Sequence, residues 1–384
     1  MRTEAGLRSL VIDCRFVHHS GIGRYMRALV PRVLRQLPEA QAVLLVGRQE
    51  RDAAFERQCL ALGAQLRRVE AGMYSLAEQW RVPLAVPRCD VFWMMHYDVP
   101  FLPVRARRRL VTIHDMAHLA VPDGMGLAKR AYARLFYWRA AQSDAILTVS
   151  EFSKREILAC ERVRPERVHV VYNGVEDSLR PCGDARQIAA ARDRYGIPPR
   201  YLLFVGNLKP NKNLPRLLAA FARAKRQTPQ LKETALVVVG RRSGLRTGEG
   251  DLDDLLRVLG LVCGRDVVLA GEVDDAELRA LYTGALAFVF PSLYEGFGLP
   301  PLEAMACGCP VLAAHAASLP EVCGDAALYF SPRAPEEMAA ALSRIAAEPR
   351  LRSELRASGL RHTKRFSWDA AAGEIAALLC SLAV

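Results

Sequence analysis

The chain has 384 residues, of which 51% are hydrophobic, so it is long enough for two α/β domains and too apolar to be disordered. No apolar run approaches the roughly 18 to 20 residues that a membrane-spanning helix needs. The formal charge of +12 concentrates in residues 1–180, which hold 28 Lys/Arg against 19 Asp/Glu. An anionic membrane or a phosphorylated acceptor suits this charge. Nucleic acid is the weaker choice of partner, because no zinc finger or RNA-recognition signature is present.

The beginning of the chain and its cysteines both favour a cytoplasmic protein. The apolar run at residues 10–12 is too short for a signal peptide and continues into charged residues, so it predicts a first strand. Ten cysteines are scattered from Cys14 to Cys380 without the spacing of zinc ligands. We expect reduced thiols that serve mostly as small core residues.

Short β-branched runs alternate with longer amphipathic stretches through the first half of the chain. The helical patterns include residues 22–37, 127–141 and 151–159. The predicted strands are residues 9–13, 42–46, 91–93, 110–113, 145–148 and 168–171. This alternation favours parallel strands joined by helical crossovers.

The same pattern restarts after a turn signal at Asn173-Gly174 and a loop at residues 180–184. The second series of predicted strands is 201–205, 235–239, 266–269, 287–290, 310–313 and 327–330. We therefore predict an α/β protein with two doubly wound, Rossmann-like domains, residues 1–180 and 181–365. A final helix in residues 366–384 could pack on either domain, including back on the first. Ligands bind beyond the carboxyl ends of such strands, which predicts one site in a cleft between facing domains.

A glycine-punctuated loop follows the predicted strand 287–290. Gly296 and Gly298 expose backbone N–H groups beside the start of a helix, a place that favours anions. Glu295 and Glu303 flank this loop, and carboxylates there can accept hydrogen bonds from vicinal sugar hydroxyls. A simpler explanation is that Glu303 lies in the first helical turn and offsets the helix dipole by about 0.3–1 kcal/mol. The two glutamates and the glycine loop together favour the sugar site.

Three further positions follow predicted strands, where ligand-binding residues belong. Gly21 and Gly23 form a two-glycine turn after residues 9–13, a signal that is weak by itself. His114 follows residues 110–113, and a buried structural histidine is the alternative. Lys212 follows residues 201–205, where a cation could neutralise a diphosphate.

An Asp-x-Asp string at residues 251–254 is a poor metal site. It begins an apparent amphipathic helix at residues 252–259, after a glycine-rich stretch at 244–250. Acidic residues at a helix start are ordinary caps. We assign it no metal.

Several short sequence motifs, taken in their order along the chain, resemble those of one enzyme family. They are Glu-x7-Glu at 295–303, Thr-Val-Ser-Glu-Phe-Ser at 148–153, Val-Tyr-Asn-Gly-Val at 171–175, Phe-Val-Gly-Asn-Leu-Lys-Pro-Asn-Lys-Asn-Leu at 204–214 and Ser-Leu-Pro-Glu-Val at 318–322. Together they resemble the retaining GT-B glycosyltransferases of family 4, the group 1 glycosyl transferases. The resemblance runs from about residue 9 to residue 370.

The resemblance implies roles for the matched residues of the second domain, which would bind the nucleotide sugar. Glu295 would contact the hydroxyls of the donor sugar, and Glu303 would hold those of the ribose. The backbone of Gly296, Phe297, Gly298 and Leu299 would face the donor sugar and its diphosphate.

The loop that follows residues 201–205 would supply positive charge to the diphosphate. It begins at Gly206, and Asn207 stands where some members of the family have an arginine, which leaves Lys209 or Lys212 as the cation.

The first domain would lie on the acceptor side. The Gly21–Gly23 loop would approach the diphosphate, and His114 would contact the donor sugar or the acceptor near the reacting carbon. The resemblance implies front-face substitution with retained configuration. Lys212, the glycine loops and helix N-termini would replace the metal ion of other glycosyltransferases.

The resemblance is closest to bacterial mannosyltransferases of surface-polysaccharide assembly, which implies GDP-mannose as donor substrate and no further cofactor. The acceptor would be a glycan or a lipid-linked glycan, reached at the inner face of the cell membrane. Basic and aromatic residues at 124–139 are typical of a helix that lies on an anionic membrane, and packing of the aromatics into their own domain is the alternative.

Two other functions stay open: a sugar-nucleotide 2-epimerase of the same fold, and a silent nucleotide-sugar-binding subunit. A dinucleotide oxidoreductase is disfavoured, because no Gly-x-Gly-x-x-Gly opens either domain.

Overall fold

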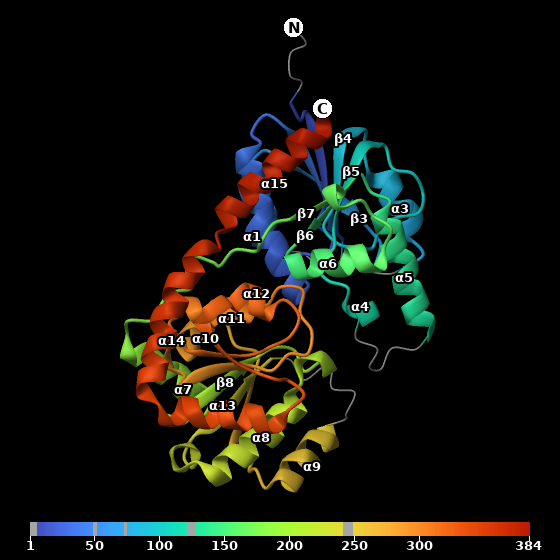
Figure 1. Ribbon diagram of the computed structural model, residues 1–384. Helices are drawn as coiled ribbons and strands as arrows, with labels where there is room; N and C mark the ends of the chain where they lie inside the picture. The colour runs from blue at the N-terminus through green and yellow to red at the C-terminus, as the bar shows by residue number, and fades with distance from the viewer. Residues whose placement is uncertain (1–5, 49–51, 73–74, 121–126, 241–248) are drawn as a thin grey trace. The chain divides into compact units, whose positions relative to one another are not determined.

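A computed structural model describes residues 6–48, 52–72, 75–120, 127–240 and 249–384 of the chain (Figure 1). The chain forms two compact units: unit 1 is Met1–Gly174 with Phe366–Val384, and unit 2 is Val175–Arg365. The chain enters unit 2 a few residues before the expected boundary at 180/181, and it returns to unit 1 between residues 365 and 366.

Unit 1 is built on a parallel sheet of seven strands. Its order is β3 (Gln65–Val69), β2 (Gln41–Gly47), β1 (Ser9–Asp13), β4 (Cys89–Met94), β5 (Ala106–Thr112), β6 (Ala145–Thr148) and β7 (Val168–Val170). The helices between the strands are α1 (Ser20–Gln36), α2 (Ala53–Ala61), α3 (Glu78–Ala85), α4 (Ala117–Ala120), α5 (Leu127–Ala141) and α6 (Glu151–Cys160). The alternation read from the sequence is confirmed, although β3 was not predicted.

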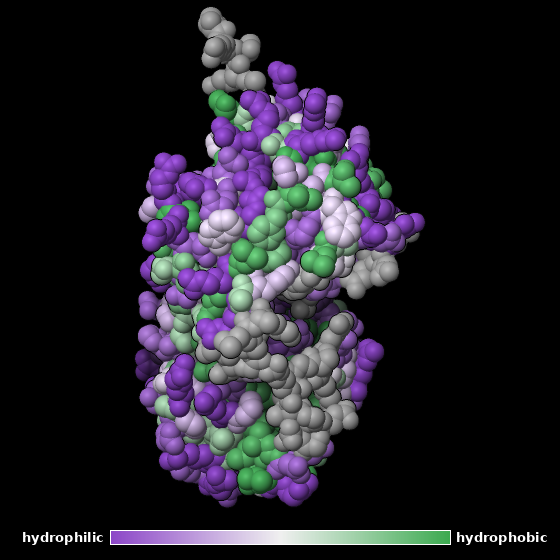
Figure 2. Space-filling view, turned by 90° about the vertical axis from the view of Figure 1, so that its right-hand side faces the viewer, coloured by the Kyte–Doolittle hydropathy of each residue, from purple (hydrophilic) through white to green (hydrophobic). Residues whose placement is uncertain are grey.

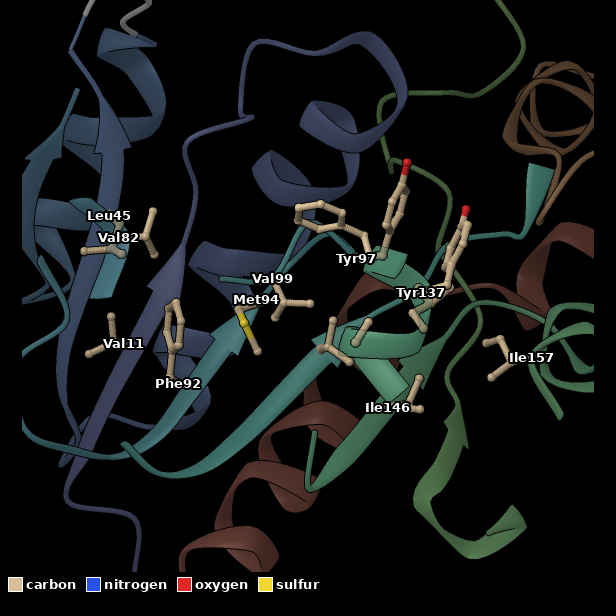
Figure 3. Close-up of a cluster of buried hydrophobic side chains, with 14 of the residues drawn as sticks. Val11, Leu45, Val82, Phe92, Met94, Tyr97, Val99, Tyr137, Ile146 and Ile157 are labelled. Carbon is tan, nitrogen blue, oxygen red and sulfur yellow. The ribbon is translucent and has the colours of Figure 1, made fainter. Parts of the chain in front are cut away.

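The core of unit 1 explains why its inner strands read as continuous apolar runs. Helices cover both faces of such a sheet, so side chains on both sides of a strand are buried. Figure 3 shows part of one cluster, in which Val11 of β1, Phe92 and Met94 of β4 and Ile146 of β6 pack among aromatic rings. Tyr97 and Tyr137 stack in this cluster with ring centroids 4.2 Å apart. The packing fixes the carboxyl ends of the strands, where the candidate site residues begin.

The C-terminal helix α15 (Trp368–Ala383) belongs to unit 1, where it packs against α1. Arg32 of α1 lies 3.3 Å from Asp369. The backbone of Gly174 lies so close to Trp368 that a Cβ on the glycine would be 2.1 Å from the tryptophan backbone nitrogen. Both points at which the chain passes between the units are therefore held together within unit 1.

Unit 2 repeats the architecture on a parallel sheet of six strands. Its order is β10 (Val267–Gly271), β9 (Ala235–Val239), β8 (Tyr201–Val205), β11 (Ala287–Phe290), β12 (Val311–Ala314) and β13 (Ala327–Phe330). Its helices are α7 (Ala185–Arg194), α8 (Leu214–Gln227), α9 (Glu249–Leu259), α10 (Asp275–Gly284), α11 (Leu299–Ala306), α12 (Leu319–Cys323), α13 (Pro335–Ala347) and α14 (Pro349–His362). The predicted class, two doubly wound Rossmann-like domains, is confirmed.

Each sheet has one point at which the strand order reverses. In unit 1 the chain moves outward from β1 to β3 and then returns to place β4 on the other side of β1. In unit 2 the same reversal lies between β8 and β11. Loops that leave neighbouring strands in opposite directions open a crevice at this position, and doubly wound proteins bind ligands there.

Candidate functional site

An ion pair joins the two loops at the switch point of unit 2. Lys212 follows β8 and Glu295 follows β11, and the Lys212 Nζ lies 2.6 Å from Glu295 Oε1. Both side chains are about 15% exposed, so water screens this pair less than it screens a surface pair. The ammonium also lies 5.0 Å from the centre of the Phe290 ring. Two residues that were singled out separately in the sequence are thus brought together.

Two serines that the sequence analysis did not select shape the Glu295 loop. Ser292 Oγ donates a hydrogen bond to Glu295 Oε1, the oxygen that also contacts Lys212. Ser318 Oγ lies 2.9 Å from the Glu295 carbonyl oxygen and 2.8 Å from that of Phe297. The Ser-Leu-Pro-Glu-Val motif at 318–322 could have indicated Ser318, because this motif is one of those that resemble the family. The hydroxyls fix the backbone on which Glu295 sits.

Glu303 is buried inside α11, with only 4% of its surface exposed. The expectation that it lies in the first helical turn was wrong, because α11 begins at Leu299 and Glu303 is its fifth residue. Only the first turn leaves N–H groups unpaired, so dipole compensation does not explain this carboxylate. Tyr282 donates a long hydrogen bond of 3.4 Å to Glu303 Oε2. A buried carboxylate needs such partners, and ligand hydroxyls are suitable additional donors.

Close packing accounts for the glycine before α11. Gly298 has φ +102°, a backbone conformation that L-residues with a side chain rarely adopt. A Cβ there would also lie 2.7 Å from Leu319 Cδ2. The loop therefore turns tightly from Phe297 into Leu299, at the N-terminus of α11, where N–H groups attract anions.

The loop after β8 places its two lysines differently. Lys209 is exposed, whereas Lys212 lies against Gly206, with its Cδ and Cε 3.7 Å from the place where a glycine Cβ would be. Asn207 is partly buried in the same loop. Of the two cations expected for the diphosphate, Lys212 is the one held toward Glu295.

Asn213 anchors this loop, although the sequence analysis gave it no role. It is 2% exposed and adopts a left-handed backbone conformation with φ +61°. Its Nδ2 donates hydrogen bonds to the carbonyl oxygens of Pro291, at 3.1 Å, and Pro332, at 2.8 Å. The loop after β8 is thereby tied to the strand end that precedes Glu295.

In unit 1, the two glycines after β1 have different roles. Gly23 lies in α1, and a Cβ there would be 2.1 Å from the carbonyl oxygen of Val17. Nothing lies within 4 Å of a Cβ placed on Gly21. Gly23 therefore allows close packing of the loop, whereas Gly21 leaves open space beside the backbone.

His114 follows β5, and its surroundings favour the neutral ring with the proton on Nε2. Its Nε2 lies 3.1 Å from the carbonyl oxygen of Met95, so this nitrogen carries the proton and Nδ1 is an acceptor in the neutral ring. Burial lowers the pKa of His114, partly offset by the Met95 carbonyl and by Asp115. The Tyr25 ring packs edge-on against it at 4.8 Å. The geometry suits a neutral hydrogen-bonding residue better than a proton donor.

His96, which follows β4, lies near other histidines at this edge of the unit 1 sheet. Its pKa is lowered well below the ordinary value, first by burial and then by the proximity of His114, His118 and His19. Its Nδ1 accepts a hydrogen bond of 3.2 Å from the Asp98 N–H. Four histidines from the segments that follow β1, β4 and β5 therefore gather where unit 1 was expected to meet the acceptor.

A buried ionic network lies in the same region and was missed from the sequence. Arg15 contacts Asp13 at 2.8 Å and Glu78 at 2.6 Å, with all three side chains nearly inaccessible. Burial and the neighbouring Asp98 raise the pKa of Glu78, and Arg15 offsets this only in part. The Asp13-x-Arg15 spacing was a local signal, but Glu78 is too distant in sequence to have been paired with it.

The acidic string at 251–254 lies within α9, where Asp254 contacts Arg257 at 2.8 Å. The preceding residues 241–248 lie outside the described part of the chain. Among the residues that the structure describes, no group of three or more histidine, cysteine, aspartate or glutamate side chains is arranged to hold a metal ion.

Known protein families match both units. Residues 19–179 match the family described as Glycosyltransferase Family 4, and residues 188–362 match the one described as Glycosyl transferases group 1. The chain is 30% identical to O-antigen chain mannosyltransferase B of Escherichia coli, over 91% of this chain and 93% of that protein. It is 33% identical to a D-inositol 3-phosphate glycosyltransferase of Streptomyces bingchenggensis, over 78% of this chain and 62% of that protein.

Solved structures share the fold at much lower identity. Anabaena Alr3699/HepE in complex with UDP-glucose superposes with a TM-score of 0.76 and 18% identity, over 97% of this chain and 99% of that chain. WaaG, a glycosyltransferase involved in lipopolysaccharide biosynthesis, gives a TM-score of 0.73 and 16% identity, over 97% and 99%. These likenesses show the GT-B fold.

Proposed function

Because the chain belongs to the family 4, group 1 glycosyltransferases, we propose that it transfers mannose from GDP-mannose to a glycan or lipid-linked acceptor, with retained configuration and without a metal ion. The observation that carries this proposal is the Lys212–Glu295 pair at the switch point of unit 2, with buried Glu303 on the helix that follows the Glu295 loop. Mannose is favoured because a relative matched over more than nine tenths of both chains is a mannosyltransferase.

In this proposal, different residues of unit 2 contact different parts of the donor. Glu303 accepts hydrogen bonds from the ribose hydroxyls, and Glu295 accepts them from the sugar. Lys212 and the N–H groups before α11 face the diphosphate. Because Glu295 already orients the ammonium of Lys212, little reorganisation is needed when negative charge develops on the leaving group.

The reaction exchanges one bond at the anomeric carbon. The bond to the β-phosphate oxygen breaks, and the acceptor hydroxyl oxygen bonds to the same face of the sugar. The departing phosphate takes the hydroxyl proton, so no carboxylate nucleophile is required. His114 of unit 1 is a neutral ring that hydrogen-bonds the donor or acceptor through Nδ1, since Nε2 is engaged with Met95.

Calorimetry in EDTA tests the donor assignment, with GDP-mannose, UDP-glucose and GDP as titrants. GDP-mannose is expected to bind with the highest affinity, and Glu303→Gln is expected to weaken it at least tenfold. Glu336→Gln is the matched control, because this glutamate lies on α13 and pairs with Arg223 at the surface. Binding that requires a divalent cation would contradict the metal-free mechanism.

Product analysis tests transfer and stereochemistry. The enzyme is incubated with GDP-mannose and mannose-terminated oligosaccharides, and the one-bond C–H coupling at the new anomeric carbon is measured by NMR. An α-linked product is expected. A β-linked product would exclude retention, and isomerised nucleotide sugar formed without acceptor would identify an epimerase instead.

A further inference from the structure

Exposed apolar side chains are concentrated in one part of unit 1. Among the described residues, twelve large hydrophobic side chains are exposed, and seven of them lie between residues 76 and 138. Single exposed hydrophobic residues are normal on a protein surface, whereas a contiguous group marks an interaction site. Six of the seven form what we call the apolar face: Trp80, Leu84, Phe101, Leu102, Leu135 and Trp138.

The apolar face draws its residues from α3, from α5 and from the loop between β4 and β5. Trp80 and Leu84 are four residues apart on α3, and Leu135 and Trp138 are three apart on α5, so each pair lies on one side of its helix. Phe101 joins the helices: its N–H donates to Gln79 Oε1 at 2.8 Å, and its ring packs edge-on against Phe136 at 5.2 Å. Figure 2 shows this side of the molecule, with hydrophobic patches among polar residues.

The outward side chains of α5 are not needed for its own packing. Phe136 and Tyr137 are at most 3% exposed and join the core of unit 1, whereas Trp138 is 49% exposed. Tyr132 stacks on Phe136 with ring centroids 4.3 Å apart. The aromatic residues of this helix therefore divide between a buried side and a solvent-facing side.

Exposed arginines outnumber exposed acids on the segment that carries the apolar face. Within the described part of residues 76–138, six arginines are exposed and no carboxylate is: Arg81, Arg88, Arg105, Arg107, Arg108 and Arg134. Three of them share an acid with a neighbouring element, at Glu70, Asp90 and Asp144. Arg88 and Arg105 form no ion pair with another described residue, so their charge is available to a ligand.

We propose that the apolar face rests on an anionic bilayer surface, with its tryptophans at the headgroup level and its arginines on lipid phosphates. Exposed aromatic and leucine side chains beside bases are the composition of interfacial contacts, and each base near an anionic surface adds attraction. No helix in the described part of the chain is long and apolar enough to cross a membrane. The inference deepens the proposed function, since a lipid-linked acceptor is presented at such a surface.

Intrinsic fluorescence of the full chain reports this contact directly. Trp80 and Trp138 are about half exposed, whereas Trp93 and Trp368 are buried, so a shift on adding vesicles comes from the apolar face. Vesicles of phosphatidylcholine with phosphatidylglycerol are expected to shift the emission to shorter wavelength, and pure phosphatidylcholine vesicles are not. Brominated lipid chains are expected to quench the shifted emission.

Vesicle sedimentation of variants locates the contact. Leu84→Ser with Leu135→Ser is expected to weaken binding at least tenfold, and Arg88→Glu with Arg105→Glu to abolish it at physiological salt. The matched controls are Leu60→Ser and Arg57→Glu on α2, where both side chains are exposed outside the face; these are expected to bind within twofold of the unchanged protein.

Three results would overturn the inference. They are absence of binding to phosphatidylglycerol vesicles, equal losses in the face and control variants, and a self-associated protein that only the face variants convert to monomer. GDP-mannose calorimetry on the same variants separates the two proposals. Donor binding with lost vesicle binding leaves the donor assignment intact, and vesicle binding without donor binding counts against the proposed function alone.

Discussion

The switch points of the two sheets share one architecture, and both carry paired charges, but they differ in how far those charges are buried. In unit 2, Lys212 and Glu295 pair with each other and keep about 15% of their side-chain surface exposed. In unit 1, Arg15 pairs with Asp13 and Glu78 and all three side chains are almost inaccessible, while burial lowers the pKa of the nearby His96 and His114. The comparison teaches that the same sheet topology gathers charged residues in both units, whereas the packing around each switch point decides how accessible they remain.

The largest expected effect is on the unit 2 ion pair. Lys212→Ala is expected to lower kcat by about 10²–10³-fold, on the order of 2.7–4 kcal/mol, because a preorganised charge on the leaving group is lost. Steady-state transfer from GDP-mannose measures it. Lys209→Ala in the same loop is the control and is expected to change kcat less than threefold, since its side chain is exposed. Equal losses in both would remove the distinction between the two lysines.

The next largest expected effect is the loss of stability on substituting a glycine of unit 1. Gly23→Ala is expected to destabilise the protein by about 1–3 kcal/mol, because the new methyl group meets the Val17 carbonyl. Gly21→Ala has open space and is expected to stay within about 0.5 kcal/mol. Urea unfolding followed by tryptophan fluorescence compares them. A stable Gly23→Ala protein would mean that the loop moves away without cost.

The buried network predicts a pH dependence of stability. Because the folded-state pKa of Glu78 is raised, the folded protein binds more protons than the unfolded chain above the carboxyl's ordinary value of about 4.5. The contribution of Glu78 to the free energy of unfolding is therefore full at low pH, and it decreases as the pH rises toward the pKa of the folded state. The unchanged protein should lose more stability between pH 6 and pH 9 than Glu78→Gln does, by on the order of 1 kcal/mol. The fall in Tm between the two pH values, compared for both proteins, measures this difference. An unchanged difference would show that Glu78 is ionised beside Arg15.

The smallest expected effect is at the buried carboxylate of unit 2. Tyr282→Phe removes a hydrogen bond to Glu303 that is long at 3.4 Å, so donor affinity is expected to fall only about twofold, or roughly 0.5 kcal/mol. Tyr195→Phe, whose hydroxyl bonds Glu277 elsewhere in unit 2, is the control for calorimetry. A tenfold loss would mean that Tyr282 sets the orientation of Glu303 or contacts the donor itself.

The fold was largely predictable because most strands are buried on both faces and read as apolar runs. The exception is β3, Gln65–Val69, an edge strand whose Arg67 and Arg68 interrupt the run. Its partner β2 supplies the hydrogen bonds that define it, and a partner lies outside any local window.

The candidate site was predictable where its residues belong to continuous loops. Lys212, Glu295 and Glu303 could be selected from the loops after two strands, although their roles stay predictions. The Arg15–Glu78 contact could not be found in this way, because 63 residues separate the two and only the folded sheet brings them together. Asn213 lies inside the matched motif at 204–214, but its hydrogen bonds to the carbonyls of Pro291 and Pro332 form only in the folded structure.

The interleaving of the two units also sets an order of events during synthesis on the ribosome. Residues 175–365 form one uninterrupted stretch and can complete their fold as soon as they emerge. Residues 6–174 must wait for α15, which packs on α1, and for Trp368 beside Gly174. The unit that is translated first is therefore the unit that is finished second, and the side of α1 that α15 covers stays exposed while unit 2 emerges.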